Sequence, residues 1–461
     1  MLGTGPPPTW RPQGANELRR ILPHLTILAL ALPSIAAAQE AEQQPALEIS
    51  GATFRPQPIA VGLPIATGDE VAAADEIYDA LTFDLRVSGL FDVIPRAAFL
   101  ADPREGMGPE GIAWPRWSDV GAESLVKFQV TKSEKGLRAS FKLHDVQPRR
   151  TALTLDLEGR RADARRLAHE FADALVKHFT KEPGAFSTRI AFVKRSKGAK
   201  EIWVSDYDGK NAAPITERGG IAILPAWSPG GSELAFTYFK RSLEYPNGHP
   251  QLWKATLSNG RNAAFTGRGD LNTGAAYSPD GTKIAFTMSR EGNPEIYVIN
   301  ADGTGLSRLT RSEGIDTSPV WSPDGKRIAF VSDRHGTPQI FVMNADGSSP
   351  ERLTRQGNYN QTPAWSPRGD EIAFTARDER LVFDIFTINV DTKEIRRITQ
   401  DQGQNEHPTW SPNGRMLMFS SDRSGRRSLW VSSADGNVQQ RVSTTDDAEY
   451  TDPAWGPFTK K

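Results

Sequence analysis

The residues that could do chemistry are one histidine–glutamate pair and several acidic turns. His169-Glu170, followed by Asp173, resembles the zinc-binding helix motif His-Glu-x-x-His, but an aspartate stands where the second histidine belongs. Asp206-Tyr207-Asp208-Gly209 and the repeated Asn-Ala-Asp-Gly have calcium-loop residue types, yet they lack the further oxygen ligands and the closing glutamate. We therefore assign the first to an amphipathic helix and the others to turns, and we predict no catalytic residue, no metal site and no cofactor.

Composition excludes further kinds of chemistry. The 461 residues contain no cysteine, which rules out disulfides, thiolate metal sites and cysteine nucleophiles. Neither a Gly-x-Ser-x-Gly sequence nor a glycine-rich phosphate loop occurs. The 55 Lys and Arg residues against 56 Asp and Glu residues give a formal net charge of −1. A polybasic nucleic-acid binder is therefore excluded, and we expect no nucleic-acid partner.

An internal repeat dominates the second half of the chain. Its signature is Pro-x-Trp-Ser-Pro-x-Gly or a close variant, and the aromatic residue recurs at intervals of 50, 44, 44, 45 and 45 residues. The copies stand at 225–231, 275–281, 319–325, 363–369, 408–414 and, as a fragment, 453–457. Each Ser-Pro-x-Gly predicts a tight turn that leads into a short apolar strand such as Ile328-Ala329-Phe330. Four strands in such a period are typical of a β-propeller.

Strand counting predicts how this propeller closes. The second, third and fourth strands each occur six times, but the first set, at 190–216, has no first strand before it. The surplus first strand, Pro453-Ala454-Trp455, stands at the other end of the repeats. We therefore predict an all-β propeller of six blades over 184–461, in which the C-terminal strand completes the blade that begins near Arg189 and leaves no long open edge.

Polar residues cluster where the chain crosses from one blade to the next. Such crossovers run from the rim to the axis, so their ends should surround the mouth of the central channel, where variable loops on a rigid scaffold often bind partners. Their amides, hydroxyls and carboxylates could hydrogen-bond a peptide that enters the channel. The candidate binding residues are Asn272, Thr273, Asp316, Thr317, Ser318, Asn360, Gln361, Asn405, Glu406 and His407. The alternative is that they only solvate the channel mouth or cap turns.

The N-terminal residues have the pattern of a targeting segment. Two arginines precede an apolar run over 21–32, and the run ends in small residues up to Ala38. This order is typical of a secretory signal peptide, and the run is too short to span a membrane, which takes ~20 residues. We predict a signal peptide over 1–38, a flexible tail over 39–45 and a soluble chain without membrane insertion. An exported chain without cysteine suits a bacterial periplasm.

Residues 46–183 lack the repeat and predict a small α/β domain. Apolar residues at helical spacing predict one helix from Val71 to a stop at Gly89 and a second over about 163–181. The predicted strands of a meander are 125–130, 137–146 and 151–157, with extended segments near 46–50 and 58–63. The predicted fold class is thus an α/β N-terminal domain followed by an all-β, six-bladed propeller.

Together these features resemble the TolB family. The repeat Pro-x-Trp-Ser-Pro-Asp-Gly-x-x-Ile-Ala-Phe, followed by Ile-Tyr-Val-x-Asn-x-Asp-Gly and Leu-Thr, is similar to that family's propeller repeat. Ser88-Gly89-Leu90-Phe91 and Phe186-Ser187-Thr188-Arg189 precede it in the family's order. The resemblance covers residues 46–457. It implies a non-enzymatic periplasmic scaffold of the Tol-Pal system that acts in outer-membrane integrity and in constriction during cell division.

The resemblance also implies two partners. Family members bind the lipoprotein Pal at the channel mouth and TolA through the mature N-terminus. Carried to this sequence, the Pal site falls on the crossovers before Tyr277 and Trp321, and the TolA segment falls on Leu47, Glu48 and Ile49. Other outer-membrane proteins are further candidate partners, and we expect a monomer. Because peptidase propellers and some polysaccharide lyases share the repeat, a periplasmic propeller enzyme or a glycan-binding protein is the alternative.

Overall fold

The structure is a computed structural model, and its described part begins after the predicted targeting segment. The described residues are 55–99, 104–217, 219–241, 245, 248–266, 271–377, 380–442, 445 and 447–458. The predicted signal peptide, the tail and the predicted TolA segment (Leu47, Glu48 and Ile49) lie outside these residues. Within them, no helix combines the length and the apolar character that crossing a membrane requires.

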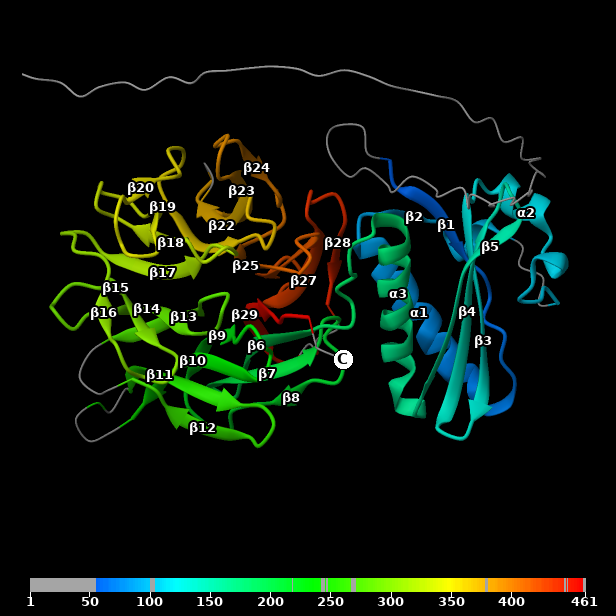
Figure 1. Cartoon of the computed structure of the whole chain (residues 1–461), viewed down its shortest axis with the longest axis horizontal. Coiled ribbons are helices and arrows are strands. Elements are labelled where there is room, and N and C mark those ends of the chain that lie inside the picture. Colours follow the sequence, from blue (N-terminus) through cyan, green and yellow to red (C-terminus); the bar gives the residue numbers. More distant parts are fainter. Residues whose placement is uncertain are drawn as a thin grey trace, which may run out of the picture. The chain divides into compact units, whose positions relative to one another are not determined.

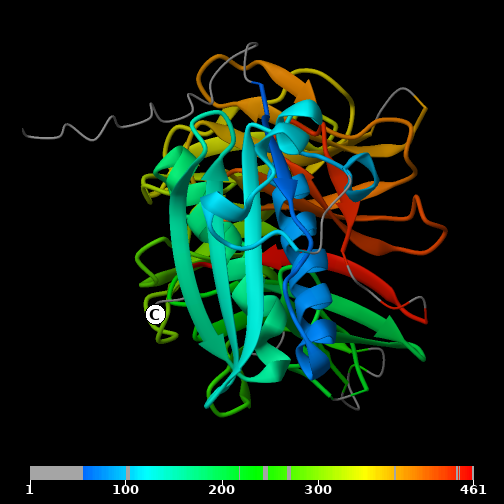
Figure 2. The same cartoon turned by 90° about the vertical axis from the view of Figure 1, so that its right-hand side faces the viewer.

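One five-stranded sheet forms the first part of the described chain, in the order β2-β1-β3-β4-β5. Strand β1 pairs in parallel with β2 and β3, whereas β3, β4 and β5 form a long antiparallel meander (Figure 2). The strands are β1 (Gln57–Val61), β2 (Phe91–Val93), β3 (Ser124–Ser133), β4 (Gly136–Asp145) and β5 (Arg150–Gly159). The predicted meander is confirmed, and β2 is a strand that the sequence prediction missed.

Two long helices, α1 (Val71–Val87) and α3 (Ala164–Thr180), pack on each other and on one face of this sheet (Figure 1). Apolar residues recur every three or four positions along each helix, so one side of each is buried in a shared core. Both helices are confirmed. Val71 is an exception on the expected apolar face, because it is 45 % exposed. The shorter helices are η1 (Gly68–Glu70), η2 (Arg96–Ala98), η3 (Pro109–Gly111), α2 (Trp114–Asp119) and η4 (Arg161–Asp163).

Six four-stranded antiparallel sheets follow and form the blades of the propeller. The blade at the closure contains β29 (Glu449–Trp455), β6 (Arg189–Ser196), β7 (Ala199–Asp206) and β8 (Ala213–Pro214). The next two are β9 (Ala222–Trp227), β10 (Glu233–Lys240), β11 (His249–Thr256) and β12 (Arg261–Ala264), then β13 (Asn272–Tyr277), β14 (Lys283–Met288), β15 (Glu295–Asn300) and β16 (Ser307–Arg308). The last three are β17 (Asp316–Trp321), β18 (Arg327–Ser332), β19 (Gln339–Asn344) and β20 (Glu351–Arg352); β21 (Asn360–Trp365), β22 (Glu371–Arg377), β23 (Phe383–Asn389) and β24 (Ile395–Arg397); and β25 (Asn405–Trp410), β26 (Met416–Ser421), β27 (Ser428–Ser433) and β28 (Gln439–Arg441).

The propeller closes as the strand count predicts. The order of the closing sheet is β29-β6-β7-β8, so the last strand of the chain lies beside the first strand of the propeller sequence. Trp455 pairs with Ile190 in this ladder, and its indole nitrogen donates a hydrogen bond to Thr188 Oγ1 at 2.7 Å. The prediction of six blades sealed by the C-terminal strand is therefore confirmed.

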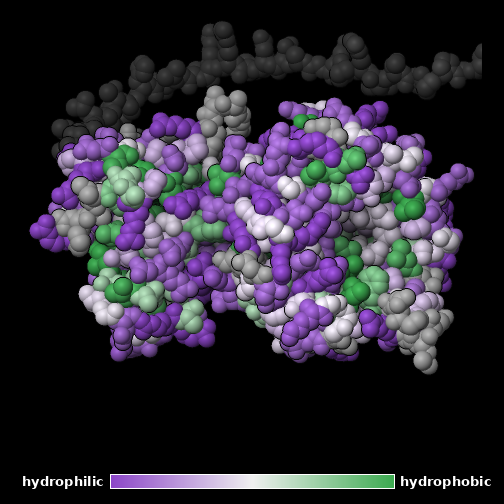
Figure 3. All heavy atoms as spheres, turned by 180° about the vertical axis from the view of Figure 1, so that it is seen from behind, coloured by the Kyte–Doolittle hydropathy of each residue, from purple (hydrophilic) through white to green (hydrophobic). Residues whose placement is uncertain are grey.

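A continuous apolar core joins the helices to the closing blade. Residues of α1 and α3 pack in one buried cluster with Ile190 and Phe192 of β6, Tyr207 and Trp455. Gly89, two residues after the end of α1, approaches the propeller so closely that an added Cβ would lie 2.8 Å from Ser433 Cβ. Its φ of +68° also favours glycine. On the side shown in Figure 3, by contrast, the coloured surface is mostly hydrophilic, and hydrophobic side chains form small separate groups.

Candidate functional site

The candidate binding residues stand at the starts of the first strands, which form the innermost ring of the propeller. Each first strand is the edge of its sheet, and it contacts the first strands of both neighbouring blades. Strands β9, β13, β17, β21, β25 and β29 thus surround the axis. All ten candidates occupy the first three positions of β13, β17, β21 and β25. The structure therefore brings them together around one end of the channel.

The first residue of each of these four strands is buried inside its blade. Asn272, Asp316, Asn360 and Asn405 are at most 1 % exposed. Asp316 accepts a hydrogen bond from Arg334 Nη2 at 2.8 Å, and Asn360 donates one to Gln339 Oε1 at 2.8 Å. Burial raises the pKa of Asp316, although hydrogen bonds from Ser332 and Arg334 oppose the rise. These four side chains are thus buried in the propeller rather than exposed at the channel mouth.

The second and third positions are the ones that a partner can reach. Thr273, Thr317, Ser318, Gln361 and His407 are half-buried at the mouth, and Glu406 is 9 % exposed. They offer hydroxyls, an amide, a carboxylate and an imidazole. A peptide with free backbone N–H and C=O groups could hydrogen-bond to such a ring.

Every first strand has a left-handed backbone at the same place. The residues are Leu224, Gly274, Ser318, Thr362, His407 and Asp452, with φ between +49° and +66°. The pairing with the second strand shifts there in each blade, as in a β-bulge. Five of the six are not glycine, although side chains with a Cβ are uncommon in this conformation. Because this backbone strain recurs in every blade around the channel mouth, it favours a functional role for the channel mouth.

Hydrogen bonds between blades hold this conformation. The backbone N–H of Ser318 donates to Thr287 Oγ1 of the preceding blade at 3.2 Å, and that of His407 donates to Thr375 Oγ1 at 3.1 Å. Gly274 makes the same contact with the blade before it. The strained residues are therefore fixed in place before any partner arrives, which reduces the entropy lost on binding.

Two charged pairs lie on the mouth between β25 and its surroundings. His407 Nε2 is 3.2 Å from Asp452 Oδ1 on the neighbouring first strand, an ion pair when the histidine is protonated. Arg427 forms an ion pair with Glu406. These pairs cross-link the ends of the strands and leave polar atoms at the opening.

The tight turns at the opposite end of the blades contact the N-terminal helices. His169 of α3 lies between two carboxylates, with Nδ1 2.7 Å from Asp84 Oδ2 of α1 and Nε2 3.4 Å from Asp208 Oδ2 of the propeller. Arg165 forms an ion pair with Asp208, and the Tyr207 hydroxyl donates a hydrogen bond to Asp84. This buried cluster, called the interdomain network below, leaves the channel mouth at the other end uncovered by the helices.

Burial and mutual attraction both shift the pKa values of the interdomain network. Burial opposes a charge on His169, but the two carboxylates outweigh it and raise the pKa of His169 to about 10. Burial would also raise the pKa of Asp208, but His169 and Arg165 hold it well below its usual range. For Asp84 burial is the larger effect and raises the pKa, against the attraction of His169. At neutral pH, His169 is therefore charged and paired.

The two motifs with metal-ligand residue types have structural roles in the described residues. His169 belongs to the interdomain network, and Asp173 accepts hydrogen bonds from the backbone N–H of Phe186 and of Ser187. Asp302 Oδ1 accepts the N–H of Thr304 at 2.9 Å, which is turn chemistry. Among the described residues, no group of three or more His, Asp or Glu side chains could hold a metal ion.

Two features of the site escaped the sequence prediction. The sequence gives one sign of the left-handed backbone position, because glycine, which favours a positive φ, stands there in one copy of the repeat as Gly274. The interdomain network had none, because its residues come from α1, α3 and a propeller turn that are far apart in the chain.

Family models match both parts of the chain. The TolB amino-terminal domain matches residues 45–152, and the TolB beta propeller domain matches residues 176–459. A Tol-Pal system protein TolB from Anaeromyxobacter dehalogenans is 47% identical over 436 residues, which cover 94% of this chain and 98% of that protein. A Tol-Pal system protein TolB from Myxococcus xanthus is 46% identical over 219 residues, 47% of this chain and only 50% of that protein.

A solved structure supports the same assignment. The crystal structure of TolB from Acinetobacter baumannii superposes with a TM-score of 0.76 at 27% identity, and the match covers 88% of this chain and 97% of that chain. The family models cover well over half of the residues, and the Anaeromyxobacter relative is matched over nearly its whole length. The chain therefore belongs to the TolB family of Tol-Pal system proteins.

Proposed function

We propose that this chain is a non-enzymatic periplasmic scaffold of the Tol-Pal system that binds the lipoprotein Pal at the channel mouth and TolA through its N-terminal segment. In this role it supports outer-membrane integrity and constriction during cell division. The observation that carries the proposal is the ring of half-buried polar side chains at the channel mouth, the end of the propeller that the helices leave uncovered. The backbone there is strained and is held in place by hydrogen bonds between blades.

The candidate residues divide into two groups in this proposal. Those at the second and third positions, including Thr273, Thr317, Ser318, Gln361 and His407, contact Pal directly. The buried Asn272, Asp316, Asn360 and Asn405 act indirectly, since they fix where the strands begin. Glu406 lies between the groups, because it is 9 % exposed and paired with Arg427.

The chain organisation is part of the proposal. Residues 1–38 are a cleaved signal peptide and 39–45 a tail, so Leu47, Glu48 and Ile49 lie near the mature N-terminus, where they bind TolA. The domains are 46–183 and 184–461. The mature protein is a monomer that takes no cofactor.

Calorimetry of the full mature chain with the soluble domain of Pal tests the first contact. We expect Thr317→Arg to lower the affinity at least tenfold, since a bulky cation would fill the mouth. Thr392→Arg is the matched control, because Thr392 is exposed in a turn at the other end of the blades. Equal affinity of a folded Thr317→Arg protein and of the control would move the Pal site elsewhere.

Deletion of residues 46–50 tests the second contact. We expect the deleted protein to lose binding to the periplasmic part of TolA and to keep its affinity for Pal. Unchanged binding of TolA would contradict the assignment of its site to Leu47, Glu48 and Ile49.

A further inference from the structure

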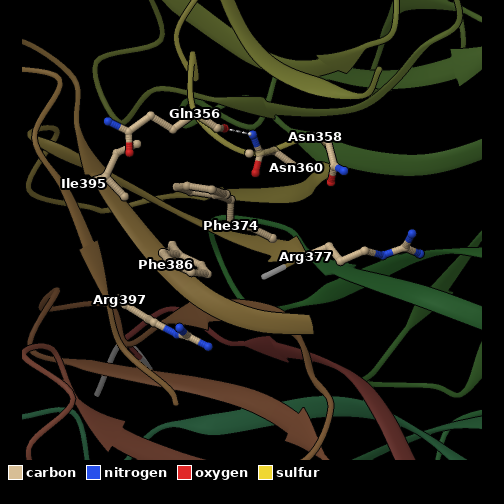
Figure 4. A pocket seen from close by; sticks show the side chains of 10 residues that line it. Gln356, Asn358, Asn360, Phe374, Arg377, Phe386, Ile395 and Arg397 are labelled. Carbon is tan, nitrogen blue, oxygen red and sulfur yellow. Dashed lines mark hydrogen bonds between the residues drawn. The ribbon is translucent and has the colours of Figure 1, made fainter. Parts of the chain in front are cut away.

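A cavity opens in the blade of strands β21–β24, near the end where the chain enters β21. Its volume is about 510 Å³, and Phe374 and Phe386 form its aromatic floor (Figure 4). Asn360, the first residue of β21, lies at its rim, and Figure 4 shows the amide oxygen directed toward Phe374. The amide nitrogen donates to Gln339 Oε1 and to the Gln356 carbonyl, whereas Oδ1 accepts no hydrogen bond within the described part of the chain.

The blade before it fills the equivalent space with an arginine of the chain itself. The guanidinium carbon of Arg334 lies 5.5 Å from the ring centroid of Phe330 and 5.0 Å from that of Phe341. Its Nη2 donates to Asp316 Oδ2 at 2.8 Å, and its Nε donates to Ser332 Oγ at 2.8 Å. Strand register makes Phe330, Phe341 and Asp316 the counterparts of Phe374, Phe386 and Asn360.

The blade after it repeats the arrangement. Arg423 lies over Phe419 and Trp430, at 5.3 and 4.5 Å from the ring centroids. Its Nη2 donates to the amide oxygen of Asn405 at 2.8 Å, and its Nε donates to Ser421 Oγ at 2.9 Å. Asn405 is the counterpart of Asn360, so an asparagine oxygen at this position is a sufficient acceptor for a guanidinium.

A one-residue shift in sequence explains why the middle blade differs. Its neighbours have Ser332-Asp333-Arg334 and Ser421-Asp422-Arg423, but this blade has Ala376-Arg377-Asp378. Successive side chains of a strand point to opposite faces, so an arginine one position earlier leaves the aromatic floor. The guanidinium carbon of Arg377 instead lies 4.9 Å from the ring centroid of Tyr359 and 5.0 Å from that of Phe383.

We propose that this cavity is a binding site for the arginine side chain of a polypeptide partner, whose guanidinium would lie over Phe374, beside Arg397 on Phe386, and donate to Asn360 Oδ1. The chain shows the geometry of such a complex twice, in the blades on either side. Ala376 replaces the serine that accepts the Nε hydrogen in both neighbours, so the incoming group makes one hydrogen bond fewer. We therefore expect millimolar affinity for an isolated side chain.

Arg397 of this blade already covers part of the floor, with its guanidinium carbon 5.5 Å from the ring centroid of Phe386, so an incoming guanidinium would lie beside it. Arg397 forms an ion pair with the fully buried Asp384. Its counterparts in the neighbouring blades are Arg352 and Arg441, which pair in register with Phe341 and Trp430. Both blades thus accommodate a fourth-strand arginine together with the arginine that covers the aromatic floor. Binding of an arginine in this cavity does not depend on which Tol-Pal protein binds the channel mouth.

Methyl NMR of the full mature chain tests the proposal, because Ile395 lines the cavity and reports on it. N-acetyl-arginine methylamide should shift the Ile395 δ1-methyl signal saturably, whereas N-acetyl-lysine methylamide should bind at least about fivefold more weakly, since it lacks the planar fork. The double variant Arg377→Asp, Asp378→Arg restores the order of the neighbouring blades. It should bind the arginine derivative at least about tenfold more weakly, the loss expected for one hydrogen bond to a charged group.

The neighbouring blade supplies a matched positive control. Arg334→Ala should open a second cavity of the same kind, so the arginine derivative should raise the melting temperature of that variant more than that of the unaltered chain. Three outcomes would overturn the proposal: no saturable shift of Ile395 in the unaltered chain, an equal shift in the double variant, or preferential binding of N-acetyl-glutamate methylamide to Arg377 and Arg397.

Discussion

The interdomain network predicts a large stability loss from one change of charge, Asp208→Asn. Asp208 is 1 % exposed and pairs with both Arg165 and His169. The asparagine would leave these two cations buried beside each other, with Asp84 as the remaining carboxylate. Breaking a buried ion pair by removing one partner destabilises by about 3–5 kcal/mol. We expect a loss of this size in the free energy of unfolding.

Asp302→Asn is the matched control for this measurement. Both aspartates precede a glycine in a turn, and the Oδ1 of each accepts the N–H two residues later, from Lys210 at 3.1 Å and from Thr304 at 2.9 Å. Asp302 has no interdomain partner among the described residues, so its substitution should cost only about 1 kcal/mol. The difference between the two variants therefore isolates the interdomain ion pairs.

Urea unfolding followed by tryptophan fluorescence and circular dichroism measures both losses. We expect the midpoint to fall much further for Asp208→Asn than for Asp302→Asn, with equal slopes if the variants unfold in one step. Equal midpoints of the two variants would refute the reasoning, because the buried charges would then contribute nothing beyond the turn.

Three further predictions concern pH, backbone strain and closure. The pKa of His169 is about 10 in the folded chain and about 6.5 in the unfolded chain, so the stability that its charge contributes is complete below pH 6.5 and is lost as pH rises through 10. Between pH 7 and 9 the unfolding free energy should therefore fall more steeply than that of His169→Gln, by about 1.4 kcal/mol per pH unit. Parallel pH profiles of the two proteins would contradict this. Gly274→Ala, with open space for the Cβ but a φ of +66°, should lower the unfolding free energy by about 1 kcal/mol, a loss that urea titration would detect or exclude. A chain that ends before Tyr450 exposes the edge of β6 and should aggregate or become sensitive to limited proteolysis; a truncated protein with an unchanged cooperative melting temperature would contradict the role of β29.

The propeller was predictable because its information is local and repeated. Each Ser-Pro-x-Gly turn and each short apolar strand can be identified within one repeat, and six copies confirm one another. Closure required only counting, since one strand was missing at 190–216 and one was surplus at Trp455. The helices α1 and α3 were predictable for a similar reason, because their spacing places apolar side chains on one face.

The candidate site was predictable in position but not in orientation. The sequence located Asp316, Thr317 and Ser318 at a channel mouth, but it could not show that the first of them turns into the blade. The shift in strand pairing at the third position breaks the simple alternation of side chains, so a residue's number no longer tells its face. Counting back from Trp321 therefore does not tell that Asp316 is buried and that Thr317 is half-buried at the mouth.

The interdomain network and the cavity were not predictable, because each depends on distant or repeated contacts. His169 and Asp84 are 85 residues apart, and no pattern in α3 distinguishes a histidine that meets two carboxylates from one that faces water. The sequence shows that the arginine stands one position earlier in the blade of Arg377 than in the blade of Arg334. Only the structure shows that Arg334 covers the aromatic floor of its blade and that Arg377 does not.

Tyr207 couples the closure of the propeller to the attachment of the N-terminal helices. Its ring stacks on Trp455 of β29 at a centroid distance of 5.9 Å, and its hydroxyl is bonded to Asp84 of α1. Peeling β29 away would remove the support on one side of this tyrosine and admit water to the charges on the other. Damage at the final strand should therefore loosen α1, which lies about a hundred residues before the repeats begin, and hydrogen exchange of the α1 amides would register it.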